Sequence, residues 1–182
     1  MNLDDINKKW HRKNKCELKK SATQPVFGSG NTKAKIVFIG EAPGKDEDLQ
    51  GKPFVGRSGK FLDEMLESIK LQRKDIYITN TVKYRPPKNR DPKPEEIKEC
   101  WPWLVEELNF IKPEIIVTLG RHAMNRFFPK EKISEVHGKI LKNKNTEIKC
   151  QKFLVLYHPA AALYNGSMKK ILLKDFKKLG RI

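Results

Sequence analysis

The sequence contains no apolar segment of about 18 residues, the length needed to span a membrane, and it begins with a polar stretch that lacks a signal-peptide core. Cysteine is also scarce. The three cysteines are an odd number and lie 84 and 50 positions apart, which argues against the disulfide framework of a small secreted protein. These absences predict a cytoplasmic protein that does not associate with membranes.

Acidic residues are few beside basic ones, 22 against 38, and the formal net charge is +16 at pH 7. Such a charge favours a polyanionic partner, because each neutralised phosphate releases condensed counterions. Lysine supplies 30 of the 38 basic residues, however, and abundant lysine also accompanies thermal adaptation. Charge alone therefore leaves nucleic-acid binding and compositional bias equally open.

The Gly-Lys-Ser/Thr sequence of a nucleotide-triphosphate loop is absent, which argues against an ATPase. Internal repeats and low-complexity tracts are absent as well. A chain of 182 residues is long enough for one sizeable core and short for two. We expect a single domain over residues 1–182, with residues 1–34 as a lead-in segment.

Short apolar runs alternate with amphipathic segments along the rest of the chain. Strands are predicted at 35–39, 75–80, 114–119 and 153–157, and helices at 58–69, 94–110 and 167–179. A hairpin or irregular strands are expected within 129–151. This alternation predicts an α/β fold in which helices cover both faces of a parallel sheet.

Several polar residues stand where these strands end. Glu41, Asn80 and His158 each lie just beyond a different strand, and the carboxyl ends of parallel strands share one edge of a sheet. The glycine-rich loop 40–59 adds Phe54 and Glu47. An aromatic ring, an amide, an imidazole and carboxylates suit a flat heterocycle such as uracil, flipped out of a nucleic acid.

This constellation also suits cleavage of the bond between base and sugar. His158 would stabilise the departing base by a hydrogen bond, and Glu41 or Glu47 would orient the attacking water. Each residue has an ordinary structural interpretation when taken alone, since His158 precedes a proline, Asn80 suits a turn, and Phe54 suits a loop anchor. Their joint placement at strand ends carries the hypothesis.

Two loops are candidates for DNA contact. The first would bind phosphates through basic side chains on either side of Pro86-Pro87, and the second would fill the space left by a flipped base with Leu163 or Tyr164. A solvated charge run and ordinary core packing are the alternatives. The basic residues of the first loop are Lys83, Arg85, Lys88 and Arg90.

Several motifs together resemble family 4 of the uracil-DNA glycosylase superfamily. They are Gly40-Glu41-Ala42-Pro43-Gly44, Glu47-Asp48, Gly51-Lys52-Pro53-Phe54-Val55-Gly56-Arg57, Thr79-Asn80-Thr81-Val82-Lys83, Arg85-Pro86-Pro87, Asn89-Arg90, Leu119-Gly120 and His158-Pro159. The resemblance implies a three-layer α/β/α sandwich around a four-stranded parallel sheet. It also implies a uracil-binding set of Ala42, Phe54, Asn80 and His158, with Glu41, Glu47 and His158 as catalytic residues.

The cysteines depart from this family. The four-iron, four-sulfur cluster that the resemblance implies would have its ligands at four positions, which here read Lys13, Cys16, Tyr84 and Cys100. Such a cluster normally needs four thiolates. We therefore expect no cofactor and no metal, with Cys16 and Cys100 as neighbouring remnants of the site.

The leading hypothesis is a monofunctional hydrolase of DNA repair that removes uracil from DNA and leaves an abasic site. It would work as a monomer on uracil-containing DNA. The alternative is a catalytically weak DNA-binding protein of the same fold that recognises deaminated or single-stranded DNA. An enzyme of nucleotide metabolism that acts on free bases is a third class.

Overall fold

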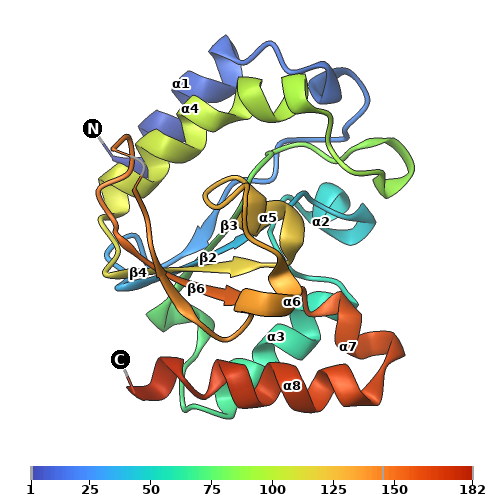
Figure 1. Cartoon of the computed structure of the whole chain (residues 1–182). Coiled ribbons are helices and arrows are strands. Elements are labelled where there is room, and N and C mark those ends of the chain that lie inside the picture. The colour runs from blue at the N-terminus through green and yellow to red at the C-terminus, as the bar shows by residue number, and fades with distance from the viewer. Residues whose placement is uncertain (1, 145, 182) are drawn as a thin grey trace.

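The computed structural model describes residues 2–144 and 146–181 and consists of helices packed on both sides of a central sheet (Figure 1). The helices are α1 (Leu3–Lys13), α2 (Lys45–Gln50), α3 (Arg57–Glu67), α4 (Pro94–Ile111), α5 (Arg121–Asn125), α6 (Ile133–Val136), α7 (Ala160–Tyr164) and α8 (Gly166–Phe176). The strands are β1 (Ser29–Gly30), β2 (Ile36–Gly40), β3 (Tyr77–Asn80), β4 (Ile115–Leu119), β5 (Ile140–Lys142) and β6 (Lys152–Leu156). Short 3₁₀ turns are η1 (Glu17–Lys20), η2 (Arg73–Asp75), η3 (Pro87–Asn89) and η4 (Leu179–Arg181).

The sheet has six strands in the order β1-β3-β2-β4-β6-β5. The four inner strands are parallel and correspond to the four predicted strands. The expectation of a four-stranded sheet is wrong in its strand number, because β1 and β5 add antiparallel edges. β1 is an exposed Ser-Gly pair without apolar residues, and β5 lies within 129–151, where a hairpin or irregular strands were expected.

The two faces of the sheet are covered by different helices (Figure 1). α1 and α4 lie over one face, where Trp103 donates a hydrogen bond across the interface to Asn7 at 3.0 Å. α3 and α8 lie over the other face, and the apolar stripe of α3 is buried there as its spacing predicts. This stripe consists of Phe61, Leu62, Met65 and Leu66.

The observed helix boundaries agree in part with those predicted from the sequence. α4 begins at Pro94 with Glu95 and Glu96 in its first turn, as expected. α3 begins after Gly56 rather than after Ser58, and α1 ends at Lys13, although the sequence predicts a first helix over about residues 6–18. Among the described residues, no helix has both the length and the apolarity required to cross a membrane.

The parallel register sets the position of the site. Gly40 at the end of β2 lies opposite Asn80 at the end of β3, and β6 ends two strands away beyond β4. The loops that leave these strands therefore emerge from one edge of the sheet, as open α/β folds place their ligand crevices.

Candidate active site

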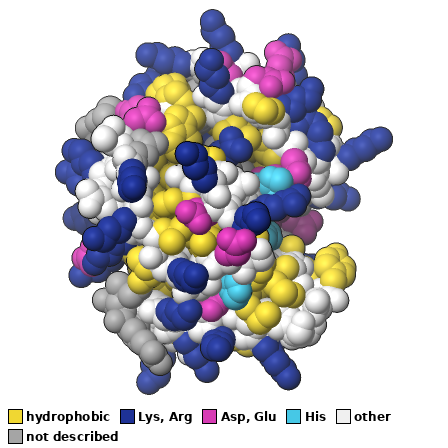
Figure 2. Space-filling view, viewed as in Figure 1, with side chains coloured by type: hydrophobic (Ala, Val, Ile, Leu, Met, Phe, Trp, Pro, Cys, Tyr) yellow, Lys and Arg dark blue, Asp and Glu magenta, His cyan; other side chains and the backbone are white. Residues whose placement is uncertain are grey.

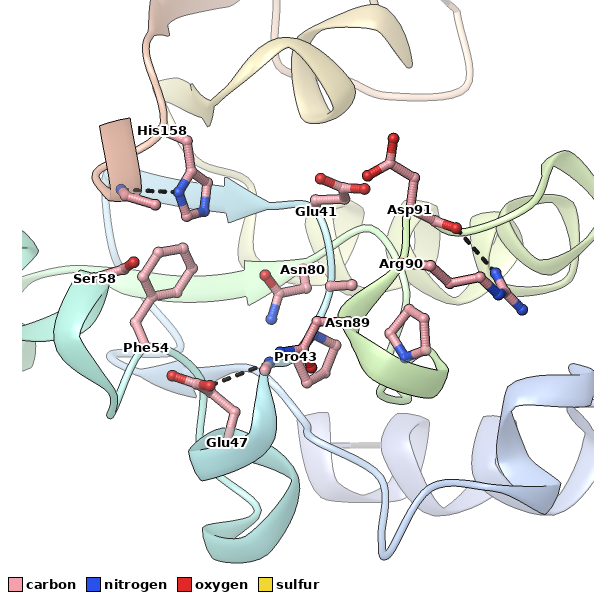
Figure 3. A pocket seen from close by; sticks show the side chains of 14 residues that line it. Glu41, Pro43, Glu47, Phe54, Ser58, Asn80, Asn89, Arg90, Asp91 and His158 are labelled. Atoms are coloured by element: carbon pink, nitrogen blue, oxygen red, sulfur yellow. Dashed lines mark hydrogen bonds between the residues drawn. The ribbon is translucent and has the colours of Figure 1, made fainter. Parts of the chain in front are cut away.

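A cavity of about 340 Å³ lies at this edge, within the range of small-molecule sites. Figure 3 shows its side chains converging from the β2–α2 loop, the end of β3, the loop before α4 and the segment after β6. All the residues predicted to bind uracil or to catalyse its release line this cavity. Its full lining is Glu41, Ala42, Pro43, Gly44, Glu47, Phe54, Ser58, Asn80, Pro86, Asn89, Arg90, Asp91, His158 and Ala160.

Phe54 forms one wall of the cavity. Its backbone has φ +54°, a left-handed conformation that costs a non-glycine residue free energy unless neighbouring contacts hold it. Arg73 provides such contacts by donating hydrogen bonds to the carbonyl oxygens of Pro53 and Phe54. The Phe54 ring stacks on the imidazole of His158, with ring centroids 5.8 Å apart and an interplanar angle of 29°.

Asn80 presents an amide to the same space. The residue is 2% exposed, and its Oδ1 has no hydrogen-bond partner among the described residues. A buried polar atom without a partner is costly, and such atoms in native structures usually have a function. Gly40 allows this arrangement, because a Cβ there would overlap Asn80 Oδ1 and lie 2.8 Å from the Phe54 ring.

His158 is held in one orientation and one tautomer. The backbone N–H of Ala160 donates to His158 Nδ1 at 3.1 Å, so in the neutral ring the proton is on Nε2. Burial lowers the pKa of His158 to about 4, and the nearby Glu47 carboxylate offsets this only in part. At neutral pH the imidazole is therefore an uncharged hydrogen-bond donor.

Glu41 lies across the cavity from Phe54 (Figure 3). Its Oε1 is buried and, within the described part of the chain, has no hydrogen-bond partner. Burial and the charge of Asp91 raise the pKa of Glu41 to about 7, against the opposing effects of Arg121 and Arg126. A carboxylate with a pKa near the working pH is suited to act as a general base.

Glu47 has a different environment. Its carboxylate accepts hydrogen bonds from the backbone N–H groups of Gly44, Val55 and Gly56, at 3.1, 3.0 and 2.9 Å. These bonds tie the start of α2 to the loop that carries Phe54. The geometry therefore favours Glu47 as the residue that closes the loop, and Glu41 as the residue with a free carboxylate oxygen.

The predicted phosphate contact of Lys83 is wrong. Lys83 is completely buried, and its ammonium group donates to Glu107 of α4 at 2.6 Å, to the Asn80 carbonyl at 3.1 Å and to Thr79. The ion pair with Glu107 compensates the cost of burying the charge. Lys83 instead holds the backbone of Asn80 in place from beneath the cavity.

The other predicted DNA contacts have varied environments. Lys88 is exposed, Arg85 donates to Asn89 at 2.7 Å, and Arg90 pairs with the buried Glu96 at 2.6 Å. Lysine and arginine side chains are spread over the whole face shown in Figure 2 rather than gathered in one patch. Lys88 is thus the exposed cation of this loop, while Arg85 and Arg90 are half-buried.

The second predicted DNA loop forms α7. Leu163 is partly buried against the core of the α3–α8 face, whereas Tyr164 is 81% exposed. The guanidinium carbon of Arg57 lies 5.7 Å from the centre of the Tyr164 ring. An exposed aromatic ring beside a cation suits contact with bases and phosphates, which favours Tyr164 over Leu163.

Sequence reasoning missed Asp91 and His122. His122 lies three residues beyond the end of β4, so the rule of strand ends that selected Asn80 also applies to it. Ligand atoms of Glu41, Asp91 and His122 lie within 4.8 Å of one another, the one such group of His, Cys, Asp and Glu that the described residues contain.

This group does not fit a metal site. Arg121 Nε donates to His122 Nε2 at 3.1 Å, which occupies a lone pair that a metal would need. The charges of Arg121 and Arg126 also act on Glu41 and would repel a cation there. The contacts favour an ionic cluster of protein groups.

The four positions of the cluster implied by the resemblance hold residues with different surroundings. Lys13 is exposed at the end of α1. The Tyr84 ring is buried, and its hydroxyl lies 3.0 Å from His11 Nδ1. Cys16 and Cys100 are buried neighbours, and the hydrogen bond between their thiols raises the pKa of Cys16. Two thiols and a tyrosine ring do not fit a cluster that needs four thiolates.

Comparisons with known proteins define the class to which this fold and cavity belong. Residues 27–179 match the model of the uracil DNA glycosylase superfamily. The type-4 uracil-DNA glycosylase of Archaeoglobus fulgidus is 49% identical over 99% of this chain and 92% of its own length. Enzymes of the same name from Saccharolobus solfataricus and Thermotoga maritima are 47% and 40% identical, over 98% and 90% of this chain and 85% of each relative.

The chain therefore belongs to the uracil-DNA glycosylase superfamily and, within it, to the type-4 family. A type-5 uracil-DNA glycosylase of Thermus thermophilus is also similar, at 37% identity, but over only 56% of this chain. Similarity to the type-4 enzymes thus extends over almost the whole sequence.

Proposed function

We propose that this protein removes uracil from DNA by hydrolysing its N-glycosidic bond, and that the base enters the cavity flipped out of the helix. The observation that carries this proposal is the buried, unpartnered Oδ1 of Asn80 beside the stacked ring of Phe54. The near full-length similarity to type-4 uracil-DNA glycosylases supports it.

The cavity chemistry matches the edge of uracil. Asn80 Oδ1 accepts the ring N3–H, and its amide nitrogen donates to the adjacent O4. Cytosine has an acceptor at N3 and a donor at C4, so it would set acceptor against acceptor and donor against donor. Phe54 supplies a flat apolar face for the ring.

Bond cleavage sends the electron pair of the C1'–N1 bond onto the base, where it is delocalised onto the carbonyl oxygens. The Nε2–H of His158 donates to O2 of the departing uracil and stabilises that charge. Water then forms the new bond to C1', and its proton passes to Glu41. Uracil leaves as an anion that takes up a proton from solvent, Glu41 returns its proton to solvent, and the DNA retains an abasic site.

The test is an oligonucleotide carrying a single uracil, incubated with enzyme and then with alkali to cleave abasic sites. The expected result is a shortened strand, and none from the matched thymine oligonucleotide. Absence of product at high enzyme concentration would favour the DNA-binding alternative instead. Release of base from free deoxyuridine, without action on DNA, would indicate an enzyme of nucleotide metabolism.

Substitution of each glutamate tests which carboxylate positions the water. Glu41→Gln is expected to lower the single-turnover rate by roughly 100-fold or more, because the amide cannot accept a proton. The wild-type rate is expected to rise through about pH 7 as Glu41 loses its proton, with no loss from His158 until the pH nears 4.

The matched variant is Glu47→Gln, which is expected to lower thermal stability, because it weakens the three bonds from backbone N–H groups. Its rate should keep the same pH dependence as the wild type. The fall in rate below about pH 7 is the acid limb of the profile. If Glu47→Gln lost this limb while Glu41→Gln kept it, the roles of the two glutamates would be reversed.

We also propose that the protein binds no iron–sulfur cluster. Support comes from Tyr84, whose buried ring packs against Trp103 with centroids 6.4 Å apart and whose hydroxyl reaches His11. Asn14 adds a further bridge, because its amide donates to the Glu99 carbonyl of α4 at 2.8 Å. Packing and hydrogen bonds thus join the segments that a cluster would otherwise link.

Purified protein is therefore expected to be colourless and to contain no stoichiometric iron. The measurements are absorbance near 400 nm and iron content, made on protein purified without oxygen. Absorbance with about four irons per chain would overturn the proposal. Reconstitution with iron and sulfide is a second check, which should leave the folded protein without bound iron.

We further propose that the protein acts as a monomer and contacts DNA through Arg85, Lys88 and Tyr164. The exposure of Lys88 and Tyr164 supports these contacts. Sedimentation equilibrium at micromolar concentration should give the mass of one chain, and a mass of two chains would contradict the monomer.

A further inference from the structure

Asp91 comes from the loop between η3 and α4, and its carboxylate lies beside that of Glu41 at the cavity. Figure 3 shows the two side chains next to each other, and their closest ligand oxygens lie within 4.8 Å. No hydrogen bond satisfies Glu41 Oε1 among the described residues. The nearby negative charge of Asp91 therefore acts on Glu41 directly through space.

The backbone of Asp91 is held in place. Arg90 donates one hydrogen bond to the Asp91 carbonyl at 2.9 Å and two to the Glu96 carboxylate, at 2.9 and 2.6 Å. Glu96 is only 4% exposed, and it also accepts from the backbone of Lys93 at the start of α4. These contacts fix the loop that carries Asp91 to the body of the protein.

Other charged groups act on Glu41 from α5 and from Arg126, which directly follows that helix. Arg121 and Arg126 act on it as cations, and the Nε2 of His122 lies 3.3 Å from Asp91 Oδ2 and accepts from Arg121. Burial lowers the pKa of His122, so its ring is neutral at pH 7. Asp91 thus opposes the two arginines, which would otherwise make Glu41 a weaker base.

We propose that Asp91 is a positioning residue for the excision reaction, which keeps Glu41 basic enough to accept a proton from the attacking water. This inference rests on the proposed role of Glu41. Asp91 touches neither the base nor the water in this scheme. Its negative charge makes release of the Glu41 proton less favourable, and a stronger base takes a proton from water more readily.

The test is the pH dependence of single-turnover excision with Asp91→Asn, which removes the charge and keeps the shape. The acid limb is expected to move to lower pH by roughly one unit, as expected for a charge about 5 Å away near a protein surface. The plateau rate should fall by roughly threefold, because Glu41 becomes a weaker base. Asp91→Glu should restore the wild-type limb.

Glu95→Gln is the matched control, since it removes an equal charge from the first turn of α4. It reports the general effect of a lost negative charge on DNA affinity. An Asp91→Asn profile with its acid limb at the wild-type pH would overturn the proposal. A change in the KM of Asp91→Asn that equals the change in Glu95→Gln, with no change in the rate or its pH profile, would also overturn the proposal.

The double variant Asp91→Asn/Glu41→Gln separates failure of this inference from failure of the proposed function. If Asp91 acts through Glu41, the double variant should have the same rate and pH profile as Glu41→Gln. If Glu41→Gln keeps the wild-type rate and limb, the proposed role of Glu41 is wrong. If Glu41→Gln loses activity while Asp91→Asn leaves the limb unmoved, only the role of Asp91 is wrong.

Discussion

Asn80→Ala is expected to lower the rate of uracil excision by roughly 1,000-fold, because the variant loses the hydrogen bonds to the polar edge of the base. The wild-type residue is buried, and its Oδ1 has no partner among the described residues, so the free enzyme already bears the cost of desolvating that atom. Because that cost is already borne before binding, the site favours a base whose N–H can donate to Asn80 Oδ1. The measurement is the single-turnover rate on uracil-containing DNA.

Selectivity gives a second measurement for the same variant. Alanine cannot distinguish the donor and acceptor pattern of uracil from that of cytosine, so the ratio of their excision rates should fall towards one. The free energy of unfolding should change by less than about 2 kcal/mol, since Oδ1 makes no bond to the described residues that the variant would break. An Asn80→Ala enzyme with wild-type rate and selectivity would contradict the proposed recognition.

His158→Ala is expected to lower kcat by roughly 100- to 1,000-fold, with a smaller change in KM, because the bond to the departing base strengthens as charge develops on it. The acid limb near pH 7 should stay where it is in the wild type, since that limb belongs to Glu41. Burial lowers the pKa of His158 to about 4, so its ring is neutral across the pH range of that limb.

His137→Ala provides the control. His137 bonds to Asp175 at 2.6 Å outside the cavity, so its loss should affect stability and leave kcat within about twofold. A better leaving group gives a further check: uracil with an electron-withdrawing group at C5 should depend less on His158. Equal losses for both bases would indicate that His158 does not stabilise the leaving group.

Much of the fold was predictable because its inner strands are continuous apolar runs. A parallel strand buried on both faces has no polar alternation, and 115–119 shows this pattern plainly. The apolar spacing of Phe61, Leu62, Met65 and Leu66 likewise predicted the buried face of α3, whereas Ile69, also expected on that face, lies beyond the end of the helix. The edge strand β1 escaped prediction, because a short exposed strand is defined by its partner rather than by its own residues, whereas β5 lies within 129–151, where a hairpin or irregular strands were expected.

The residues of the candidate site were predictable to the extent that they follow strands. Glu41, Asn80 and His158 were found in this way, and the structure brings them to one cavity. The burial of Lys83 was not predictable, because a lysine in a basic loop resembles a phosphate ligand until its partner is known. That partner, Glu107, lies 24 positions away on α4.

For residues 40–59, the sequence by itself determined a glycine-rich loop at a strand end, with Phe54 and two glutamates as its functional candidates. Only the tertiary structure separated the glutamates: Glu47 accepts three backbone N–H groups, while Glu41 faces Asp91 with a buried oxygen that has no partner among the described residues. The physical reason is that a carboxylate's basicity depends on the charges and donors around it. Those neighbours come from distant parts of the chain, which meet only on folding.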